Sequence, residues 1–273
     1  MPTIHPTAVV HPGAEIHPTA QIGPYAVIGE RVRIGAGTQV DAHVVVDGWV
    51  EIGDRNHIFP GAAIGLDPQD LKYDGDPTLV KIGHDNRIRE FVTINRATKA
   101  GEMTQIGDSN LLMAYVHVAH NCLLKNGIVI ANAVSLAGHV EIESRAVIGG
   151  MAGFHQFVRV GELAMVGAMS RIDRDVPPYM LVEGSPPRVR SLNLVGIRRS
   201  GVTELEDGAV YTALKQAHRI LFRSGGGVKA ENLRELEPLL HHKMVRHLYH
   251  FVKDATQDTK RRGLIPGKSS GST

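Results

Sequence analysis

The chain has 273 residues, 42% of them hydrophobic but only 5% aromatic, so a core is possible but must be packed with aliphatic side chains. The formal net charge of +2 gives no overall field that favours nucleic acid, and the single cysteine, Cys122, excludes a disulfide framework and a thiolate metal cluster. No stretch approaches the roughly 18 apolar residues of a membrane span, and the N-terminus lacks the features of a secretion signal. We therefore expect a cytoplasmic protein with no transmembrane segment and no nucleic-acid partner.

A repeat of six residues occupies the first two thirds of the chain. From Ile4 to Ile172, every sixth residue is Ile, Leu or Val at 25 of 29 positions, and one more is Phe154. A helix needs a period of about 3.6 and an ordinary strand a period of about two, so neither explains the pattern. The repeat predicts short flat strands, each with one inward aliphatic side chain. Sharp corners join them, where Gly, Asn and Asp tolerate positive φ.

Three such hexads make one triangular coil of 18 residues. Residues 18 apart are then expected to stack in one column, about 4.8 Å apart. Each coil buries its side chains only against its neighbours, so stability is a sum of contacts between coils. Two expected interior columns are Leu112, Ile130, Ile148 and Val166, and Val118, Leu136, Phe154 and Ile172.

Two polar segments interrupt the repeat, at residues 66–79 and 95–105. Both are rich in turn-forming residues, which indicates loops that leave a rigid β-helix extending over residues 1–190. Long loops on such a scaffold are usually functional.

Beyond Ile172 the pattern changes to proline-rich connectors and then to helical spacing. We expect a helical domain over residues 191–262, with helical segments at 209–222 and 231–253 and a break at 223–227. The end of the chain, residues 263–273, is expected to be disordered because it is small and polar.

A cluster of histidines falls late in the repeat. Counting by 18 places His120, Gly138 and Gln156 in one outer column, one coil apart, and three further histidines lie close to it: His117, His139 and His155. Histidine is the usual general base for activating a hydroxyl, and a backbone N–H at a glycine is a common oxyanion donor. Because no Ser-His-Asp pattern is apparent, the spacing favours direct acyl transfer without a covalent intermediate. Two other interpretations remain open at this point, a zinc site and ordinary surface histidines.

Several distinctive runs extend over nearly the whole chain: QDLKY (69–73), NRIRE (86–90), SNLLM (109–113), HVAHNC (117–122), LAGHV (136–140), IGGM (148–151), HQF (155–157), DVPPY (175–179) and LNLVGIRR (192–199). Together they resemble the UDP-N-acetylglucosamine O-acyltransferases of the lipid A pathway. The resemblance implies a left-handed β-helix, a homotrimer with active sites between subunits, and no cofactor. The implied reaction moves an (R)-3-hydroxyacyl group from acyl carrier protein to the 3-hydroxyl of UDP-N-acetylglucosamine, the first step of lipid A synthesis.

The resemblance also implies roles for individual residues. His120 matches the general base and Gly138 the oxyanion donor, in agreement with the column count. The residues that match substrate-binding positions are Asp70, Lys72, His117, His139, His155, Gln156, Asn193 and Arg199, the last two near the nucleotide diphosphate. Ala168 matches the position that measures the acyl chain, and a glycine there would leave more room.

Three residues depart from the family pattern. Asn121 follows the expected base where some relatives carry a carboxylate, so it must orient the base as a neutral amide. Val195 stands where a glutamate can occur near the nucleotide, and Ser200 where a second arginine can.

Two other enzyme classes compete with this interpretation. The later N-acyltransferase of the same pathway normally carries a uridine-binding domain ahead of its β-helix, whereas the repeat here begins at Ile4. A trimeric zinc enzyme of the carbonic-anhydrase type would need metal bound through residues such as His117 and His139. Whether the acceptor carries a 3-hydroxyl or a 3-amino group is not decided by the sequence.

Overall fold

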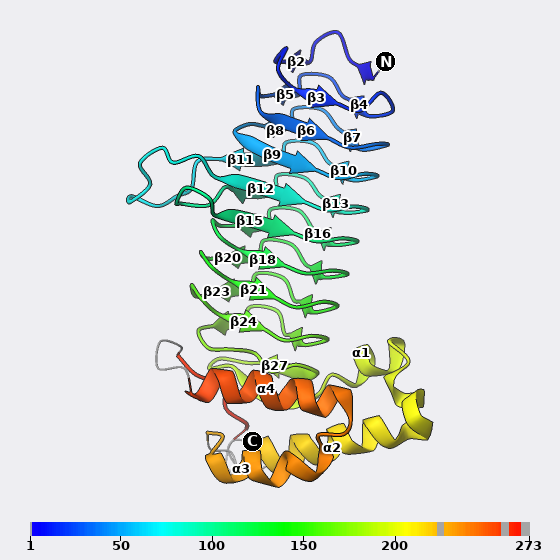
Figure 1. The fold of residues 1–273 in the computed structure, drawn as a ribbon, viewed down its shortest axis with the longest axis vertical. Coiled ribbons are helices and arrows are strands. Elements are labelled where there is room, and N and C mark those ends of the chain that lie inside the picture. Colours follow the sequence, from blue (N-terminus) through cyan, green and yellow to red (C-terminus); the bar gives the residue numbers. More distant parts are fainter. Residues whose placement is uncertain (1, 223–226, 258–261, 269–273) are drawn as a thin grey trace.

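Three parallel sheets form the three faces of a left-handed β-helix, and a group of helices covers one of its ends (Figure 1). The computed structural model describes residues 2–222, 227–257 and 262–268. The chain visits the three sheets in turn, so each complete coil contributes one short strand to each face. The predicted fold class is confirmed.

Sheet A consists of β1 (Thr3–Ile4), β4 (Gln21–Ile22), β7 (Gln39–Val40), β10 (His57–Ile58), β13 (Arg87–Ile88), β16 (Leu111–Leu112), β19 (Val129–Ile130), β22 (Val147–Ile148), β25 (Met165–Val166), β27 (Met180–Glu183) and β28 (Arg188–Leu192). Sheet B consists of β2 (Val9–Val10), β5 (Val27–Ile28), β8 (Val45–Val46), β11 (Ala63–Leu66), β14 (Thr93–Asn95), β17 (His117–Val118), β20 (Ser135–Leu136), β23 (Gly153–Phe154) and β26 (Arg171–Ile172). Sheet C consists of β3 (Glu15–Ile16), β6 (Val32–Ile34), β9 (Trp49–Ile52), β12 (Leu79–Ile82), β15 (Met103–Ile106), β18 (Leu123–Leu124), β21 (Glu141–Ile142) and β24 (Arg159–Val160). These strands pair in parallel except for β27 and β28, which are antiparallel.

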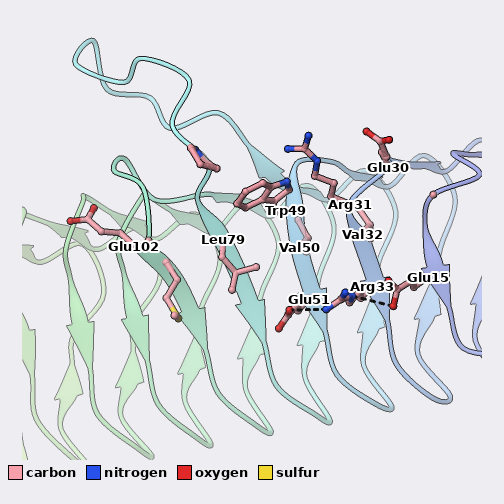
Figure 2. Close-up of a pocket in the computed structure, with 14 residues that line it drawn as sticks. Glu15, Glu30, Arg31, Val32, Arg33, Trp49, Val50, Glu51, Leu79 and Glu102 are labelled. Carbon is pink, nitrogen blue, oxygen red and sulfur yellow. Dashed lines mark hydrogen bonds and ion pairs between the residues drawn. The ribbon is translucent and has the colours of Figure 1, made fainter.

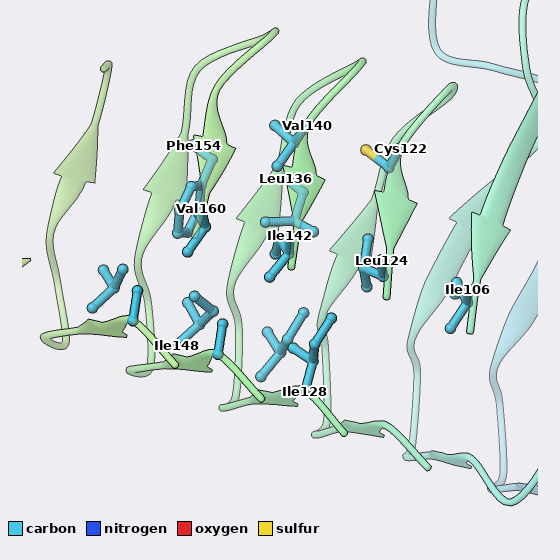
Figure 3. Close-up of a cluster of buried hydrophobic side chains, with 14 of the residues drawn as sticks. Ile106, Cys122, Leu124, Ile128, Leu136, Val140, Ile142, Ile148, Phe154 and Val160 are labelled. Carbon is cyan, nitrogen blue, oxygen red and sulfur yellow. The ribbon is translucent and has the colours of Figure 1, made fainter. Parts of the chain in front are cut away.

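Residues 18 apart stack as predicted wherever no insertion intervenes. Both predicted columns pair in register from coil to coil, Leu112 to Val166 in sheet A and Val118 to Ile172 in sheet B. Figure 3 shows the inward side chains of several coils, and they include the matching sheet C column of Ile106, Leu124, Ile142 and Val160. These side chains are almost completely buried, so each coil is held by apolar contact with the coils on either side.

Replacing Leu136 by Ala is expected to lower the free energy of unfolding by about 3 kcal/mol. Leu136 is fully buried and pairs with Val118 in one neighbouring coil and Phe154 in the other, so the shorter side chain leaves a cavity that the strands cannot close. Chemical denaturation followed by circular dichroism measures the change. Leu194→Ala removes a leucine that is 47% exposed and should change the same quantity by less than about 0.5 kcal/mol. Equal losses in the two variants would contradict the packing argument.

The corners differ from the expectation that Gly, Asn and Asp would supply positive φ. Many corner residues with positive φ carry large side chains, and one column of them contains Tyr25, His43, Phe91, Tyr115, Met151 and Met169. Ring stacking between Tyr25 and His43, and between Phe91 and Tyr115, offsets part of the backbone strain. Glycine occurs directly after many of the aliphatic positions for a different reason. A Cβ atom on Gly35 would lie 2.5 Å from the backbone of the next coil, so close approach excludes a side chain there.

Buried asparagines connect successive coils at another corner. Asn56 Oδ1 accepts a hydrogen bond from the N–H of Asn86 (2.9 Å), and Asn86 Oδ1 accepts one from the N–H of Asn110 (2.9 Å). Asn110 Oδ1 in turn accepts from the N–H of Ile128 (2.8 Å). Each amide satisfies a buried donor in the following coil. Because this ladder runs past both insertions, the insertions leave the β-helix itself unbroken.

The two insertions leave the β-helix and contact each other. They comprise residues 67–78, between β11 and β12, and residues 96–102, between β14 and β15, each slightly shorter than predicted because the flanking strands extend into it. The Arg96 guanidinium donates hydrogen bonds to Tyr73 Oη (2.9 and 3.1 Å) and to Gly65 O (3.0 Å). The second insertion is thereby fixed against the first.

The helical elements are α1 (Leu194–Arg199), η1 (Val202–Gly208), α2 (Ala209–Phe222), α3 (Ala230–Leu236), η2 (Glu237–Leu239) and α4 (Lys243–Gln257). The sequence predicted one helical segment over residues 231–253, and this was wrong, because the short η2 with Pro238 divides it into α3 and α4. Proline has no N–H to donate within a helix and clashes with the preceding turn. The predicted break at 223–227 lies outside the described residues apart from Gly227. No helix in the described part of the chain has the length and hydropathy that crossing a bilayer requires.

Helix α4 joins this group of helices to the last coils. His247 Nδ1 lies 2.7 Å from Tyr179 Oη, and His247 Nε2 lies 3.0 Å from the Glu143 carboxylate. The Arg159 guanidinium lies 4.5 Å from the centre of the Phe251 ring. The helices therefore sit on the end of the β-helix opposite the N-terminus (Figure 1).

The expected disorder of residues 263–273 is wrong for the part that the structure describes. Leu264 and Ile265 are buried, and the Ile265 N–H donates to the carbonyl oxygen of Asp175 (3.0 Å). Gly267 forms a bridge with Val189. These two apolar side chains outweigh the polar composition around them, while residues 269–273 lie outside the described chain.

Candidate active site

His120 lies at the corner between β17 and β18, against Gly138 at the same corner one coil later. A Cβ atom on residue 138 would be 2.4 Å from Cε1 and 2.6 Å from Nε2 of His120, so only glycine leaves room for the imidazole. Among the described residues, no protein acceptor is found for the Gly138 N–H. The predicted juxtaposition of imidazole and bare peptide amide is confirmed, and the catalytic roles stay predictions.

The polar contacts of His120 favour one tautomer of its ring. Nδ1 lies 2.9 Å from Asn121 Oδ1, and because an amide oxygen can only accept, Nδ1 carries the proton. Nε2 is then left with its lone pair, 3.9 Å from the carboxylate of Asp70 in the first insertion. The ring is 14% exposed, which gives a reactant access to Nε2.

Two other histidines flank this ring and remain neutral near pH 7. Burial lowers the pKa of His139, and the charge of His120 lowers it further. Burial likewise lowers the pKa of His117, again with a smaller contribution from His120. His139 stacks on Phe157 with ring centroids 4.5 Å apart, and His117 Nδ1 lies 2.7 Å from Thr93 Oγ1. Both rings are held in place as uncharged hydrogen-bonding groups.

Cys122 is close to His120 in sequence but cannot act as a nucleophile. Its thiol is buried, donates to the carbonyl oxygen of Ala137 (3.3 Å), and burial raises its pKa to about 12. A thiol in this state is inert at neutral pH. This agrees with transfer directly between two substrates.

An open hollow of about 410 Å³ lies on sheet B beside the histidines. Its wall includes His117, Gly153, His155 and Arg171, whereas Leu136 and Phe154 contribute only backbone to its floor because their side chains point into the core. Ala168, the predicted chain-measuring residue, is exposed at the corner between β25 and β26, where sheet B begins. The strands of sheet B thus lie between the His120 corner and the corner of Ala168.

His155 and Gln156 occupy the coil after Gly138. His155 Nδ1 lies 3.1 Å from the carbonyl oxygen of Gln156, and its Nε2 lies 3.2 Å from the guanidinium of Arg262. Both residues are accessible, and His155 also lines the hollow on sheet B.

Asp70 and Lys72 belong to one turn of the first insertion. Asp70 Oδ1 accepts a hydrogen bond from the Lys72 N–H (2.9 Å), which fixes the Asp70 carboxylate, and the Lys72 side chain is exposed. Asp70 reaches His120 within this copy of the chain. The two residues therefore extend the site toward the insertion.

Asn193 and Arg199 are not brought to the histidines within one chain. Asn193 is only 7% exposed and caps α1, its Oδ1 accepting from the Gly196 N–H (3.0 Å) and its Nδ2 donating to Leu163 O (2.8 Å). Arg199 lies in the last turn of α1, at the helical end of the molecule (Figure 1). Val195 is exposed on the same helix, and Ser200 caps its C-terminus.

A separate groove of about 560 Å³ crosses sheet C nearer the N-terminus, and no histidine lines it. Figure 2 shows Arg33 between Glu15 and Glu51, with Trp49 on the neighbouring part of the wall. Glu102 stands at one end of this groove, with its carboxylate directed away from those ion pairs (Figure 2).

The described part of the chain offers no set of ligands for the zinc ion of the alternative interpretation. It contains no group of three or more His, Cys, Asp or Glu side chains placed to hold a metal ion. His117 and His139, the ligands that this interpretation needed, are instead engaged with Thr93 and Phe157.

Comparison with known proteins identifies the family. An acyl-[acyl-carrier-protein]–UDP-N-acetylglucosamine O-acyltransferase from Synechocystis is 62% identical over 267 residues, which cover 98% of this chain and 95% of the relative. The chain belongs to the UDP-N-acetylglucosamine O-acyltransferase family. The family model described as "Udp N-acetylglucosamine O-acyltransferase; Domain 2" matches residues 175–265, the last coil and the helical elements.

Solved structures of this family share the fold over nearly the whole chain. UDP-N-acetylglucosamine O-acyltransferase (LpxA) from Moraxella catarrhalis is 41% identical with a TM-score of 0.88, covering 96% of this chain and 99% of that one. UDP-N-acetylglucosamine acyltransferase from Arabidopsis is 34% identical with a TM-score of 0.83, again covering 96% and 99%. The predicted family and enzyme class are confirmed.

Several residues at the site escaped the sequence analysis. Thr93 lies 24 rather than 18 residues before His117, because the second insertion shifts the count. Glu102 lies within that insertion, where no repeat predicts its neighbours. Phe157 and Arg171 fall on the same columns as His139 and Gly153, and counting by 18 from those residues would have found them.

Proposed function

We propose that the chain catalyses the reaction for which its family is named, with His120 as general base and the Gly138 N–H as oxyanion donor. The acyl group comes from acyl carrier protein, and the acceptor is the 3-hydroxyl of UDP-N-acetylglucosamine in the first step of lipid A synthesis. The observation that carries the proposal is the unprotonated Nε2 of His120 beside a glycine whose N–H has no acceptor in the described chain.

The proposed reaction proceeds in two proton transfers. Nε2 of His120 takes the proton of the sugar hydroxyl as its oxygen attacks the carbonyl carbon of the acyl thioester. The Gly138 N–H donates to the oxyanion that forms. The carbon–sulfur bond then breaks, and the proton on Nε2 passes to the departing thiolate of the carrier protein, which returns His120 to its starting state.

Neutral side chains around the base suit this reaction. Because His117 and His139 are uncharged near pH 7, they do not oppose the positive charge that develops on His120. The Asp70 carboxylate lies 3.9 Å from Nε2 and favours that charge. We assign Asp70, Lys72, His117, His139, His155 and Gln156 to substrate binding.

We propose that the assembly is a homotrimer with each site shared between two copies. Asn193 packs against Leu163 at the corner between β24 and β25, and Arg199 lies farther on in α1, so we expect a nucleotide bound at His120 to meet Arg199 only from a neighbouring copy. The guanidinium of Arg199 suits a diphosphate. Because the acyl carrier and the sugar nucleotide are cytoplasmic, we propose that compartment for the enzyme.

The acyl chain is expected to run along the hollow on sheet B toward Ala168. Replacing Ala168 by Gly removes one methyl group at the far corner and should shift the preferred acyl chain to greater length, by up to about tenfold in relative kcat/KM for the longer donor. Competition between 3-hydroxyacyl carrier proteins of different lengths, with products resolved by mass, measures this. An unchanged length profile would remove Ala168 from the proposed path.

A single assay separates the leading function from its rivals. UDP-N-acetylglucosamine and its 3-amino analogue are each paired with 3-hydroxyacyl carrier proteins of several lengths. We expect ester formation on the 3-hydroxyl, whereas exclusive amide formation would assign the chain to 3-amino acceptors.

Elemental analysis of the active protein tests the zinc enzyme, which requires about one zinc per subunit, lost on replacing His117 or His139.

A further inference from the structure

A carboxylate lies directly behind the partner of the proposed base. Asn121 Nδ2 donates a hydrogen bond of 2.7 Å to Glu102 Oε2, while Asn121 Oδ1 faces His120 Nδ1 at 2.9 Å. The three side chains therefore form an unbroken chain of hydrogen bonds from the second insertion to the imidazole. The asparagine that departs from the family pattern is its middle member.

The orientation of the Asn121 amide is fixed from both ends. A carboxylate can only accept, so Glu102 requires the NH2 group on its side. The backbone N–H of Thr98 can only donate, and it lies 3.3 Å from Oδ1, with the Thr98 hydroxyl at 3.2 Å. Each of these contacts independently places the amide oxygen toward His120.

Glu102 is itself held firmly. Its N–H donates to the carbonyl oxygen of Lys99 (3.0 Å), and its carbonyl oxygen accepts from the N–H of Leu79 (3.3 Å). The residue after it, Met103, begins β15, which pairs with β12. These bonds fix the main chain of Glu102, and its half-buried carboxylate is contacted by the Thr98 hydroxyl (3.5 Å) as well as by Asn121.

We propose that Glu102 is a positioning residue for the acyl transfer. Acting through Asn121, it holds the proton of His120 on Nδ1 and supplies the negative charge that some relatives carry on the residue next to the base. A fixed amide keeps Nε2 unprotonated and aimed at the substrate, and the carboxylate behind it stabilises the imidazolium formed during transfer. This inference rests on the proposed role of His120.

Glu102→Gln tests the inference because it keeps the shape of the side chain but removes the negative charge behind Asn121. The Thr98 N–H and hydroxyl still hold the Asn121 oxygen toward Nδ1, so this variant tests the effect of the charge itself. We expect kcat to fall roughly ten- to a hundredfold with KM changed less than about threefold. We also expect the acid limb of the pH profile of kcat/KM to move to lower pH. The charged or titratable groups that remain around His120 and its neighbour His139 are Asp70, Lys99 and His117.

The double variant Glu102→Gln with Asn121→Asp restores a carboxylate, now bonded directly to Nδ1. We expect it to recover most of the lost kcat, which a purely structural role of Glu102 in the insertion would not allow. Glu51→Gln is the matched control, a glutamate of sheet C that pairs with Arg33 in the groove that Glu102 also lines, and it should leave both kcat and the pH profile unchanged.

Two results would overturn the inference. One is an unchanged kcat and pH profile in Glu102→Gln. The other is a loss of kcat that accompanies a lowered melting temperature and is not recovered in the double variant. His120→Ala measured alongside separates the two proposals. If His120→Ala is active, the proposal that His120 is the base is wrong. If His120→Ala is inactive but Glu102→Gln is fully active, only the positioning role of Glu102 is wrong.

Discussion

His120→Ala is expected to lower kcat/KM by about a thousandfold or more while the protein keeps its fold and assembly. The change removes the imidazole that lies against Gly138 and whose Nε2 is unprotonated. The loss should fall mainly on kcat, because the hollow on sheet B and the Asp70 turn remain intact. Acyl transfer from a 3-hydroxyacyl carrier protein, followed by mass spectrometry of the sugar nucleotide, gives the rate.

The control for this variant is His11→Ala. His11 is an exposed corner histidine near the N-terminus whose Nδ1 accepts a hydrogen bond from the N–H of Gly13 (3.1 Å) in its own turn, so full activity is expected. Light scattering on both variants reports whether the trimer forms. Activity within tenfold of the parent in His120→Ala would show that another group takes the proton, and a dissociated protein would leave the fold, rather than the chemistry, as the cause of the loss.

The β-helix was predictable because its period is written directly in the sequence. One buried aliphatic side chain per strand, every six residues, leaves no other regular structure that buries all of them. The corners were predicted less well. Residues such as Tyr115 and Met151 adopt positive φ because the neighbouring coils impose it, and local preference does not reveal that constraint.

The helical region was predicted only in part. The spacing of apolar residues identified α2 and the region of α3 and α4. It did not reveal the division at Pro238, because the apolar spacing continues past a residue that cannot continue the helix. Burial of Leu264 and Ile265 depends on a surface made by the last coil and Val189, residues far apart in the sequence. Composition alone cannot show that such a surface exists.

The residues of the candidate site were also predicted only where the repeat is uninterrupted. Counting by 18 placed His120 against Gly138 because no insertion separates them. The count fails for Thr93 and Glu102, where the second insertion changes the interval, so the partners of His117 and Asn121 emerged only from the structure. Asn193 was assigned from resemblance, and its buried capping role depends on contacts with Leu163 that no periodicity indicates.

Gly138→Ala is expected to lower kcat by about a hundred- to a thousandfold without unfolding the protein. The new methyl group would lie 2.4 Å from Cε1 of His120, so the imidazole must rotate away from the place where it faces the substrate. The nearest atoms to the new Cβ all belong to the His120 side chain, so the backbone of the coil need not move. Circular dichroism and the melting temperature should therefore stay close to those of the parent protein.

The control here is Gly150→Ala, at a different corner, where the nearest atom to an added Cβ is Asn132 O at 3.4 Å. That variant should retain its activity. Adding Gly138→Ala to His120→Ala provides the sharper measurement. If the glycine matters because it makes room for the imidazole, its replacement costs little once the imidazole is gone, and the two losses fall well short of adding. Fully additive losses would mean that residue 138 acts on the acyl oxygen or the backbone independently of His120, and the steric argument for glycine at this position would then be wrong.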